Sequence, residues 1–136
     1  MVNKGLDTDL FYKVFYDKFP KIENSLVFIL PVSSCFNCFE DLLGSLEDFY
    51  KNSGLNKIIV IRNNNIKERE IRFSLQNVVS SENVYILNIE DIDYVQQHNF
   101  FPKIGFLKNG KLSCIEVFEQ GNTEKISRYF EFLELF

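Results

Sequence analysis

The sequence predicts a single α/β domain, residues 1–136, in which a central mixed β-sheet is flanked by helices. Short, largely apolar runs at Leu26–Leu30 and Lys57–Ile61 alternate with longer segments of helical periodicity, which is the pattern of a parallel β-α-β unit. The turn sequence Asn109-Gly110 between two further apolar stretches predicts an antiparallel pair. With 136 residues, 46% of them apolar, the chain can bury a core without help from disulfides.

The first 25 residues are expected to form a helical extension ahead of the sheet. Asp7 or Thr8 can cap a helix there, and Pro20 ends it. The apolar residues of this helix fall on one face, and they are Leu10, Phe11, Val14, Phe15 and Phe19.

The chain is organised around the stretch from Leu26 to Tyr50. Its apolar run Leu26–Leu30 is typical of a strand covered on both faces. Cys35 and Cys38 follow in the pattern C-x-x-C, and the apolar residues after them have helical spacing up to a stop at Gly54. A dithiol is therefore expected to open a helix directly after a buried strand. The inward-facing residues of that helix would be Phe39, Leu42, Leu43, Leu46, Phe49 and Tyr50.

The next elements continue the β-α-β pattern. Lys57–Ile61 reads as a second buried strand, and the short return loop implies a right-handed crossover and a parallel pair. We expect a helix from about residue 66 to residue 79, a short strand or extended segment at 84–89 and a short helix or turn at 90–97. The inward-facing residues of the 66–79 helix would be Ile71, Leu75 and Val78.

The C-terminal part predicts a hairpin and a last helix. Lys103–Leu107 and Lys111–Phe118 flank Asn109-Gly110, the strongest short turn signal for two antiparallel strands. The sequence Gly121-Asn122-Thr123 then introduces an amphipathic helix. The apolar face of this helix consists of Ile126, Tyr129, Phe130 and Leu133.

A cysteine at a helix start has an identifiable chemistry. Unpaired N–H groups and the positive end of the helix dipole favour an anion there, so such a cysteine loses its proton more easily than a free thiol. Two intervening residues also bring the two sulfurs of a C-x-x-C within bonding range. We expect Cys35 to be an exposed nucleophile and Cys38 to be a more buried resolving thiol.

The cysteines are also compatible with a packing role or with a metal site. Two of the three could be packing residues, because free cysteine is among the most buried residue types. Cys35, Cys38, Cys114 and His98 could together hold zinc, because C-x-x-C is also a metal-ligand spacing. The nearby β-α-β pattern favours the redox interpretation, and Cys114 is expected in mid-strand as a packing residue. We therefore expect a dithiol site that uses no metal and no cofactor.

The order of these features, from Leu26 to Phe136, resembles the thioredoxin fold. In that superfamily a cis-proline lies opposite the C-x-x-C, and Pro102 holds the matching position at the start of a proline, strand and turn block. The resemblance implies a thiol-disulfide oxidoreductase that acts on protein thiols or disulfides and on a redox partner protein, with Cys35 and Cys38 as its catalytic pair. Phe36, Phe101 and Pro102 would contact the substrate, although in a chain with 15 Phe the clustered rings could also be coincidence.

Pro102 follows Cys35 by 67 positions, which is longer than in plain thioredoxins. This length is similar to the branch of thiol-disulfide oxidoreductases related to TlpA and ResA, which carry extra elements before the proline. That branch often has an acidic residue in the dithiol helix that assists proton transfer, and Asp41 holds the matching position. Such a role would require Asp41 to be buried beside Cys38. The alternative is a solvent-facing carboxylate in the first part of the helix.

The sequence also departs from the family pattern. Ser34 stands where tryptophan is usual, no proline precedes Cys38, and Ile29 stands where true thioredoxins have a buried carboxylate. These differences bear on the redox potential and on the partner more than on the fold. The rival function is a thioredoxin-fold binding or scaffolding module in which the dithiol is vestigial.

Charge and hydropathy limit the partners and the location. A net charge of −4 and a pI near 5.0 argue against nucleic acid and against an anionic membrane surface. The sequence has no apolar run long enough to span a bilayer and no secretory signal after Met1. We therefore expect a cytoplasmic protein as the chain stands, or a periplasmic or cell-envelope protein if an export signal has been removed.

Overall fold

The computed structural model describes residues 22, 24–32, 35–89, 102–108, 111–118 and 123–135, without the side chains of residues 35, 111, 123 and 135. The helix expected in the first 25 residues, the element expected at 90–97 and the turn at 109–110 lie outside the described residues. Within them the chain forms strands and helices of a mixed α/β structure, which confirms the predicted class.

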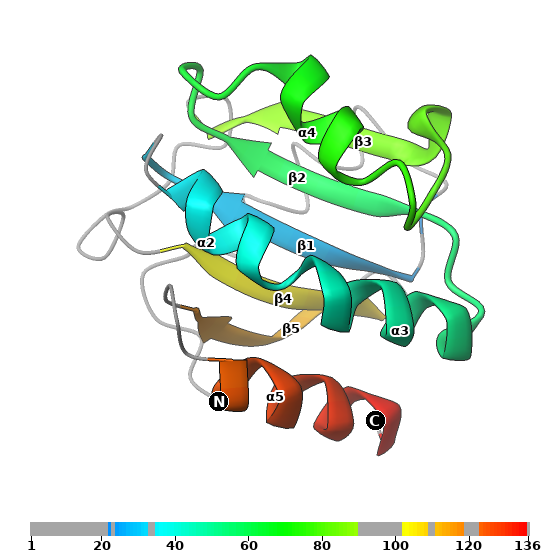
Figure 1. The fold of residues 1–136 in the computed structure, drawn as a ribbon. Helices are drawn as coiled ribbons and strands as arrows, with labels where there is room; N and C mark the ends of the chain where they lie inside the picture. Colours follow the sequence, from blue (N-terminus) through cyan, green and yellow to red (C-terminus); the bar gives the residue numbers. More distant parts are fainter. Residues whose placement is uncertain are drawn as a thin grey trace.

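Five strands of the described chain form one open sheet in the order β3-β2-β1-β4-β5 (Figure 1). β1 is parallel to β2 and β2 is parallel to β3, whereas β4 is antiparallel to both β1 and β5. The sheet is therefore mixed, as predicted, with the first strand at its centre. The strands are β1 Ser25–Leu30, β2 Ile58–Arg62, β3 Val84–Asn88, β4 Lys103–Lys108 and β5 Lys111–Val117.

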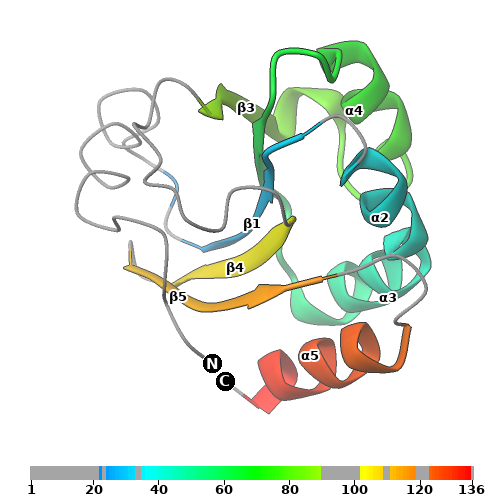
Figure 2. The ribbon, with the colours of Figure 1, turned by 90° about the vertical axis from the view of Figure 1, so that its left-hand side faces the viewer.

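The described α-helices lie on one face of this sheet (Figure 2). Right-handed crossovers from β1 to β2 and from β2 to β3 carry α2, α3 and α4 to the same side, because both step across the sheet in the same direction. α5 joins them by packing against α3, where the ring centroids of Phe49 and Phe130 are 5.2 Å apart. The helices are α2 Cys35–Asp41, α3 Leu43–Ser53, α4 Glu68–Ser74 and α5 Thr123–Leu135, and a 3₁₀ turn, η1 Ser81–Asn83, precedes β3.

The central strand β1 is buried on both faces, as its unbroken apolar sequence predicts. Phe28 belongs to the core cluster on the helix side, where its ring meets that of Phe39 edge-on at 5.1 Å. Val27 and Ile29 belong to a second cluster on the opposite face. Because β1 has no polar face, it can present functional groups only in the segments beyond its ends.

The helix that follows β1 is interrupted, where the sequence predicts one continuous helix. Leu42 adopts a turn between α2 and α3, and its N–H donates to the carbonyl of Phe39 at 3.2 Å, three residues back. Gly44 and Ser45 lie two and three residues after Leu42, and a Gly/Ser pair is a known cause of kinks in helices. Leu42 is nevertheless fully buried, so the inward face continues across the break. The stop at Gly54 is as predicted, with a left-handed φ of 77°.

The helix predicted at residues 66–79 is shorter in the structure. α4 ends at Ser74 and turns follow, in which the N–H groups of Val78 and Val79 both donate to the carbonyl of Leu75. Asn77, Val78 and Val79 have weak helix propensity, which accounts for the early end. The predicted inward positions Ile71 and Leu75 are buried, and Val78 is half-buried.

Tyr50 joins the starts of β1 and β2 to α3. Its hydroxyl donates to the carbonyl of Lys57 at 2.7 Å and accepts from the N–H of Leu26 at 3.3 Å. Burial raises the pKa of Tyr50 well above its usual value, and the hydrogen bonds with Leu26 and Ser25 oppose this shift only in part. Tyr50 therefore stays protonated in the folded protein through the ordinary pH range.

Candidate functional site

The segment that contains the two cysteines leaves the carboxyl end of β1. The carboxyl ends of the parallel strands β1, β2 and β3 lie along one edge of the sheet, and α2 begins there (Figure 1). In open α/β sheets this edge is the usual place for a functional site. Cys35 is the first residue of α2, as predicted, and its side chain lies outside the described part of the structure.

The second cysteine of the C-x-x-C lies on the partly covered side of α2. Cys38 is half-buried and packs against the core on the helix side. Phe36, also half-buried, stacks on Phe39 with ring centroids 5.8 Å apart, and Phe39 is fully buried. The aromatic column from Phe36 through Phe39 to Phe28 fixes α2 on the sheet and leaves part of the Phe36 ring at the surface.

Asp41 does not have the burial that a proton-transfer role would require. Asp41 is the last residue of α2 and its side chain is exposed, together with those of Asn37 and Glu40. The inward positions of this helix are instead occupied by Phe39 and by Leu42 just after it. The burial beside Cys38 that a proton-transfer role would require is therefore absent, and the exposure of Asp41 favours the alternative, a surface carboxylate.

Pro102 lies at the same edge of the sheet as the start of α2. Lys103 of β4 is the register partner of Ile29 in β1, so Pro102 is one residue beyond this pair, at the carboxyl end of β1. Pro102 is buried, and its carbonyl accepts a hydrogen bond from the N–H of Phe118 at 3.0 Å. Phe101 lies outside the described residues. Whether the Phe101–Pro102 bond is cis or trans is therefore not described either.

Sequence reasoning missed Asn63, which follows β2 at this same edge. Its N–H donates to the carbonyl of Leu30 at 2.9 Å, and its side-chain Nδ2 donates to the carbonyl of Pro31 at 3.0 Å. Asn63 thus holds the two residues that lead from β1 toward the dithiol. The sequence marks residues 63–65 only as a break between two elements, and no pattern in it identifies the residue that Asn63 binds.

Cys114 lies in the middle of β5, three residues before Val117, which is the register partner of Lys103. Its backbone φ is 54°, in the left-handed region, next to an irregularity in the register of β4 and β5. Its half-buried side chain packs against the core on the helix side, in agreement with the expected packing role. The hydroxyl of Tyr129 donates to the carbonyl of Cys114 at 2.6 Å, and burial, together with the nearby Cys114 and Glu116, raises the pKa of Tyr129. His98, the other non-dithiol ligand of the zinc alternative, lies outside the described residues.

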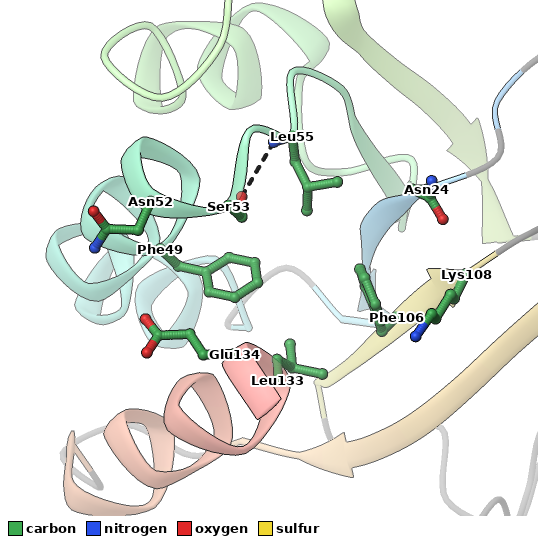
Figure 3. A pocket seen from close by; sticks show the side chains of 9 residues that line it. All are labelled: Asn24, Phe49, Asn52, Ser53, Leu55, Phe106, Lys108, Leu133 and Glu134. Atoms are coloured by element: carbon green, nitrogen blue, oxygen red, sulfur yellow. Dashed lines mark hydrogen bonds between the residues drawn. The ribbon is translucent and has the colours of Figure 1, made fainter. Parts of the chain in front are cut away.

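A second candidate site lies at the opposite edge of the sheet, beside the start of β1 and the end of β4 (Figure 3). It is a cleft of about 590 Å³ between the C-terminal ends of α3 and α5. Phe49, Phe106 and Leu133 are buried and form its floor, and they point toward one another in Figure 3. Its rim is mainly polar, with Asn24, Asn52, Ser53, Leu55, Lys108 and Glu134.

Two further features bear on metals and membranes. Among the described side chains, no three from His, Cys, Asp and Glu gather closely enough to hold a metal ion. None of the described helices combines the length and the apolar content that a bilayer-spanning segment requires.

In comparisons with known proteins, no family model, no curated protein and no solved structure matches this chain.

Proposed function

We propose that this chain is a thioredoxin-like thiol-disulfide oxidoreductase that exchanges disulfides with protein substrates and with a redox partner protein. The observation that carries the proposal is the placement of the C-x-x-C at the start of α2, at the carboxyl end of the central strand. The position of Pro102 at the same edge supports it, since the family resemblance expects a proline across from the dithiol. No metal and no cofactor is required for this chemistry.

The exchange would proceed in two steps. The Cys35 thiolate attacks one sulfur of a substrate disulfide, so that the substrate S–S bond breaks, a mixed disulfide forms and the released substrate thiolate takes up a proton. The Cys38 thiolate then attacks the Cys35 sulfur and releases the second substrate thiol. Two electrons have passed to the substrate, and the Cys35–Cys38 disulfide remains. The same steps in reverse oxidise a substrate dithiol.

The finer assignment is to the branch related to TlpA and ResA. Between β2 and Pro102 the chain contains α4 and a parallel edge strand, β3. The resemblance to that branch implies extra elements in this part of the chain, before the proline. The exposed Asp41 does not match the proton-transfer carboxylate of that branch.

A redox titration tests the proposed chemistry directly. The protein is equilibrated with buffers of varied reduced to oxidised glutathione ratio, quenched with a thiol-blocking reagent and analysed by peptide mass. We expect one two-electron transition, in which Cys35 and Cys38 pair with each other and Cys114 stays reduced. A Cys114→Ser variant should give the same curve. If Cys35 and Cys38 do not form a disulfide at any ratio, the proposed function is wrong.

The cleft between α3 and α5 favours a second candidate, a binding module with a vestigial dithiol. Its volume lies within the range of about 300–1,000 Å³ that is typical of small-molecule sites, and its floor is apolar. A small, largely apolar molecule would fit this lining. The two candidates differ in thiol reactivity, because a vestigial dithiol would react with iodoacetamide near neutral pH no faster than Cys114 does.

A further inference from the structure

β3 is an outer strand of the sheet, and space remains beside it. It pairs with β2 on one side, and no other strand of the described chain pairs with it (Figure 1). A groove of about 600 Å³ lies along β3 and the turn before it. The residues that line this groove are Arg72, Ser81, Glu82, Val84, Tyr85 and Ile86. The backbone of β3 can therefore be reached by another chain.

The hydrogen bonds of Val84 show which backbone groups of β3 point away from β2. The N–H of Val84 donates to the carbonyl of Ser81, and its carbonyl accepts from Nη1 of Arg72 at 2.8 Å. Both groups thus face the 3₁₀ turn and α4. Alternate residues of a strand direct their N–H and C=O groups to the same side, so Ile86 and Asn88 also face outward. Within the described chain, no residue pairs with these outward groups of Ile86 and Asn88.

The two outer strands of the described sheet differ in how far they resist pairing. Edge strands are commonly protected from other chains by charged residues, by proline or by a bulge. The sequence of β5 contains Lys111 and Glu116, and its register with β4 is irregular beside Cys114, whose φ is 54°. The sequence of β3, Val-Tyr-Ile-Leu-Asn, has no charge and no proline, and its register with β2 is regular. The edge of β3 is thus open to pairing, whereas that of β5 is not.

We propose that β3 is the interface of a symmetric dimer, in which β3 of one copy adds antiparallel to β3 of a second copy of this chain. The two-fold axis passes between the two Leu87 residues. Ile86 then exchanges both of its backbone hydrogen bonds with Asn88 of the second copy, and Asn88 does the same with Ile86. This register uses the outward groups of both residues and avoids Val84, whose groups are already bonded. Such a dimer would form whether or not the dithiol is redox-active.

A second copy fits this edge because the pairing is self-complementary. Leu87 opposes Leu87, and Tyr85 opposes Ile89 of the second copy, so the facing pairs are apolar. All three residues belong to the apolar cluster on the face away from the described helices or pack against it, and this face would continue across the dimer. The charges of Glu82 lie at opposite ends of the paired strands, more than about 20 Å apart, so their repulsion is screened by salt.

The small size of the contact sets the expected affinity. Each copy contributes one strand of five residues, which buries less surface than the roughly 1,200–2,000 Å² of stable complexes. We therefore expect a weak dimer with a dissociation constant on the order of 100 µM.

Sedimentation equilibrium from about 10 µM to 1 mM, with a reductant present to exclude disulfide-linked dimers, measures this constant. Wild type should pass from monomer to dimer over this range. Asn88→Pro removes an N–H that bonds the second copy and places the proline ring on the outer side of the edge, where a strand tolerates it. Its dissociation constant should rise at least about tenfold. The matched control Asn88→Ala keeps the N–H and should stay within a factor of about three of wild type.

Amide hydrogen exchange of the wild-type protein tests the register without any substitution, and it decides the question if Asn88→Pro does not fold. Between low and high protein concentration the N–H groups of Ile86 and Asn88 should become at least about threefold slower to exchange, because they gain hydrogen bonds in the dimer. The N–H of Leu87, which faces β2, should change less.

Three results would overturn the proposed dimer. A wild-type chain that stays monomeric at 1 mM would mean that a second copy does not occupy this edge. Dimerisation of Asn88→Pro as strong as that of wild type would mean that the copies meet through another surface. A wild-type dimer in which the amides of Ile86 and Asn88 exchange as fast as in the monomer would mean the same.

Discussion

At the scale of single residues, Cys38 offers the most direct test of how the two thiols divide their roles. In Cys38→Ser protein, Cys35 can still form a mixed disulfide with a substrate, but the internal thiol that displaces the substrate is gone. Covalent complexes should then persist on non-reducing gels. Cys35→Ser should trap little, because the remaining thiol of Cys38 is half-buried against the core.

The control for this experiment is Cys114→Ser, which should behave as wild type because that cysteine belongs to β5 and not to the C-x-x-C. Equal trapping by Cys38→Ser and Cys35→Ser would contradict the assigned roles. If neither variant trapped a known substrate, the binding-module alternative would be favoured.

Cys38 and Asp41 show which features of a residue's environment can be predicted from sequence. The placement of Cys38 on the partly buried side of its helix follows from periodicity, and the structure agrees. The exposure of Asp41 does not follow from periodicity. Helical spacing puts Asp41 on roughly the same side of α2 as Cys38, but it does not say whether other parts of the protein cover that end of the helix. The contact from Asn63 to Pro31 joins residues 32 positions apart, so local sequence patterns cannot reveal it.

At the scale of elements, the two ends of α3 predict opposite effects for two glycines. Gly44 lies in the first turn of α3, and a Cβ added there would meet no atom within 4 Å. Gly44→Ala should therefore stabilise the protein by about 0.5–1 kcal/mol through better helix propensity. Gly54 has a φ of 77°, so Gly54→Ala should destabilise the protein by about 1–2 kcal/mol.

Urea unfolding of the two variants and wild type measures both effects under the same conditions. An unchanged slope with a shifted midpoint would show that only stability changed. A loss of stability in Gly44→Ala would mean that the break before α3 needs backbone freedom at this position. A neutral Gly54→Ala would contradict the left-handed end of α3.

Strands were easier to predict than helix ends. The strands depend on runs of apolar residues and on one turn signal, and the structure has strands at all five predicted places. Helix limits depend on small differences in propensity between neighbouring residues, which the spacing of apolar residues does not report, so the break at Leu42 and the early end of α4 were missed.

At the scale of the whole molecule, topology puts the candidate site together from segments far apart in the sequence. Residue 35 of α2, Asn63 after β2 and Pro102 before β4 all lie at the carboxyl end of β1, because β2 and β4 both pair with that strand. The sequence predicted the parallel pair and the hairpin. It could not predict the pairing of β4 with β1, or the position of β3 at the edge, because these depend on which strand edges remain open once the first pair has formed.

The stability of the molecule at alkaline pH should depend on Tyr50 and Tyr129. Burial raises the pKa of both above the usual value of about 10, which they recover on unfolding. Above that pH the unfolded chain releases two protons that the folded protein keeps, so unfolding becomes more favourable as the pH rises. The stabilising contribution is therefore complete below pH of about 10 and is lost progressively above it, by up to about 1.4 kcal/mol per pH unit for each tyrosine.

Urea unfolding of wild type, Tyr50→Phe and Tyr129→Phe between pH 8 and 11.5 tests this dependence. At pH 8 each phenylalanine variant should be less stable than wild type by about 1 kcal/mol, because each loses a hydrogen bond to a backbone carbonyl, of Lys57 or of Cys114. Above pH of about 10 each variant should lose stability less steeply than wild type, because it lacks one of the two protons released on unfolding. The curves should therefore converge as the pH rises. Parallel curves across the whole range would mean that the two hydroxyls ionise equally easily in the folded and the unfolded chain, against the burial that the structure gives them.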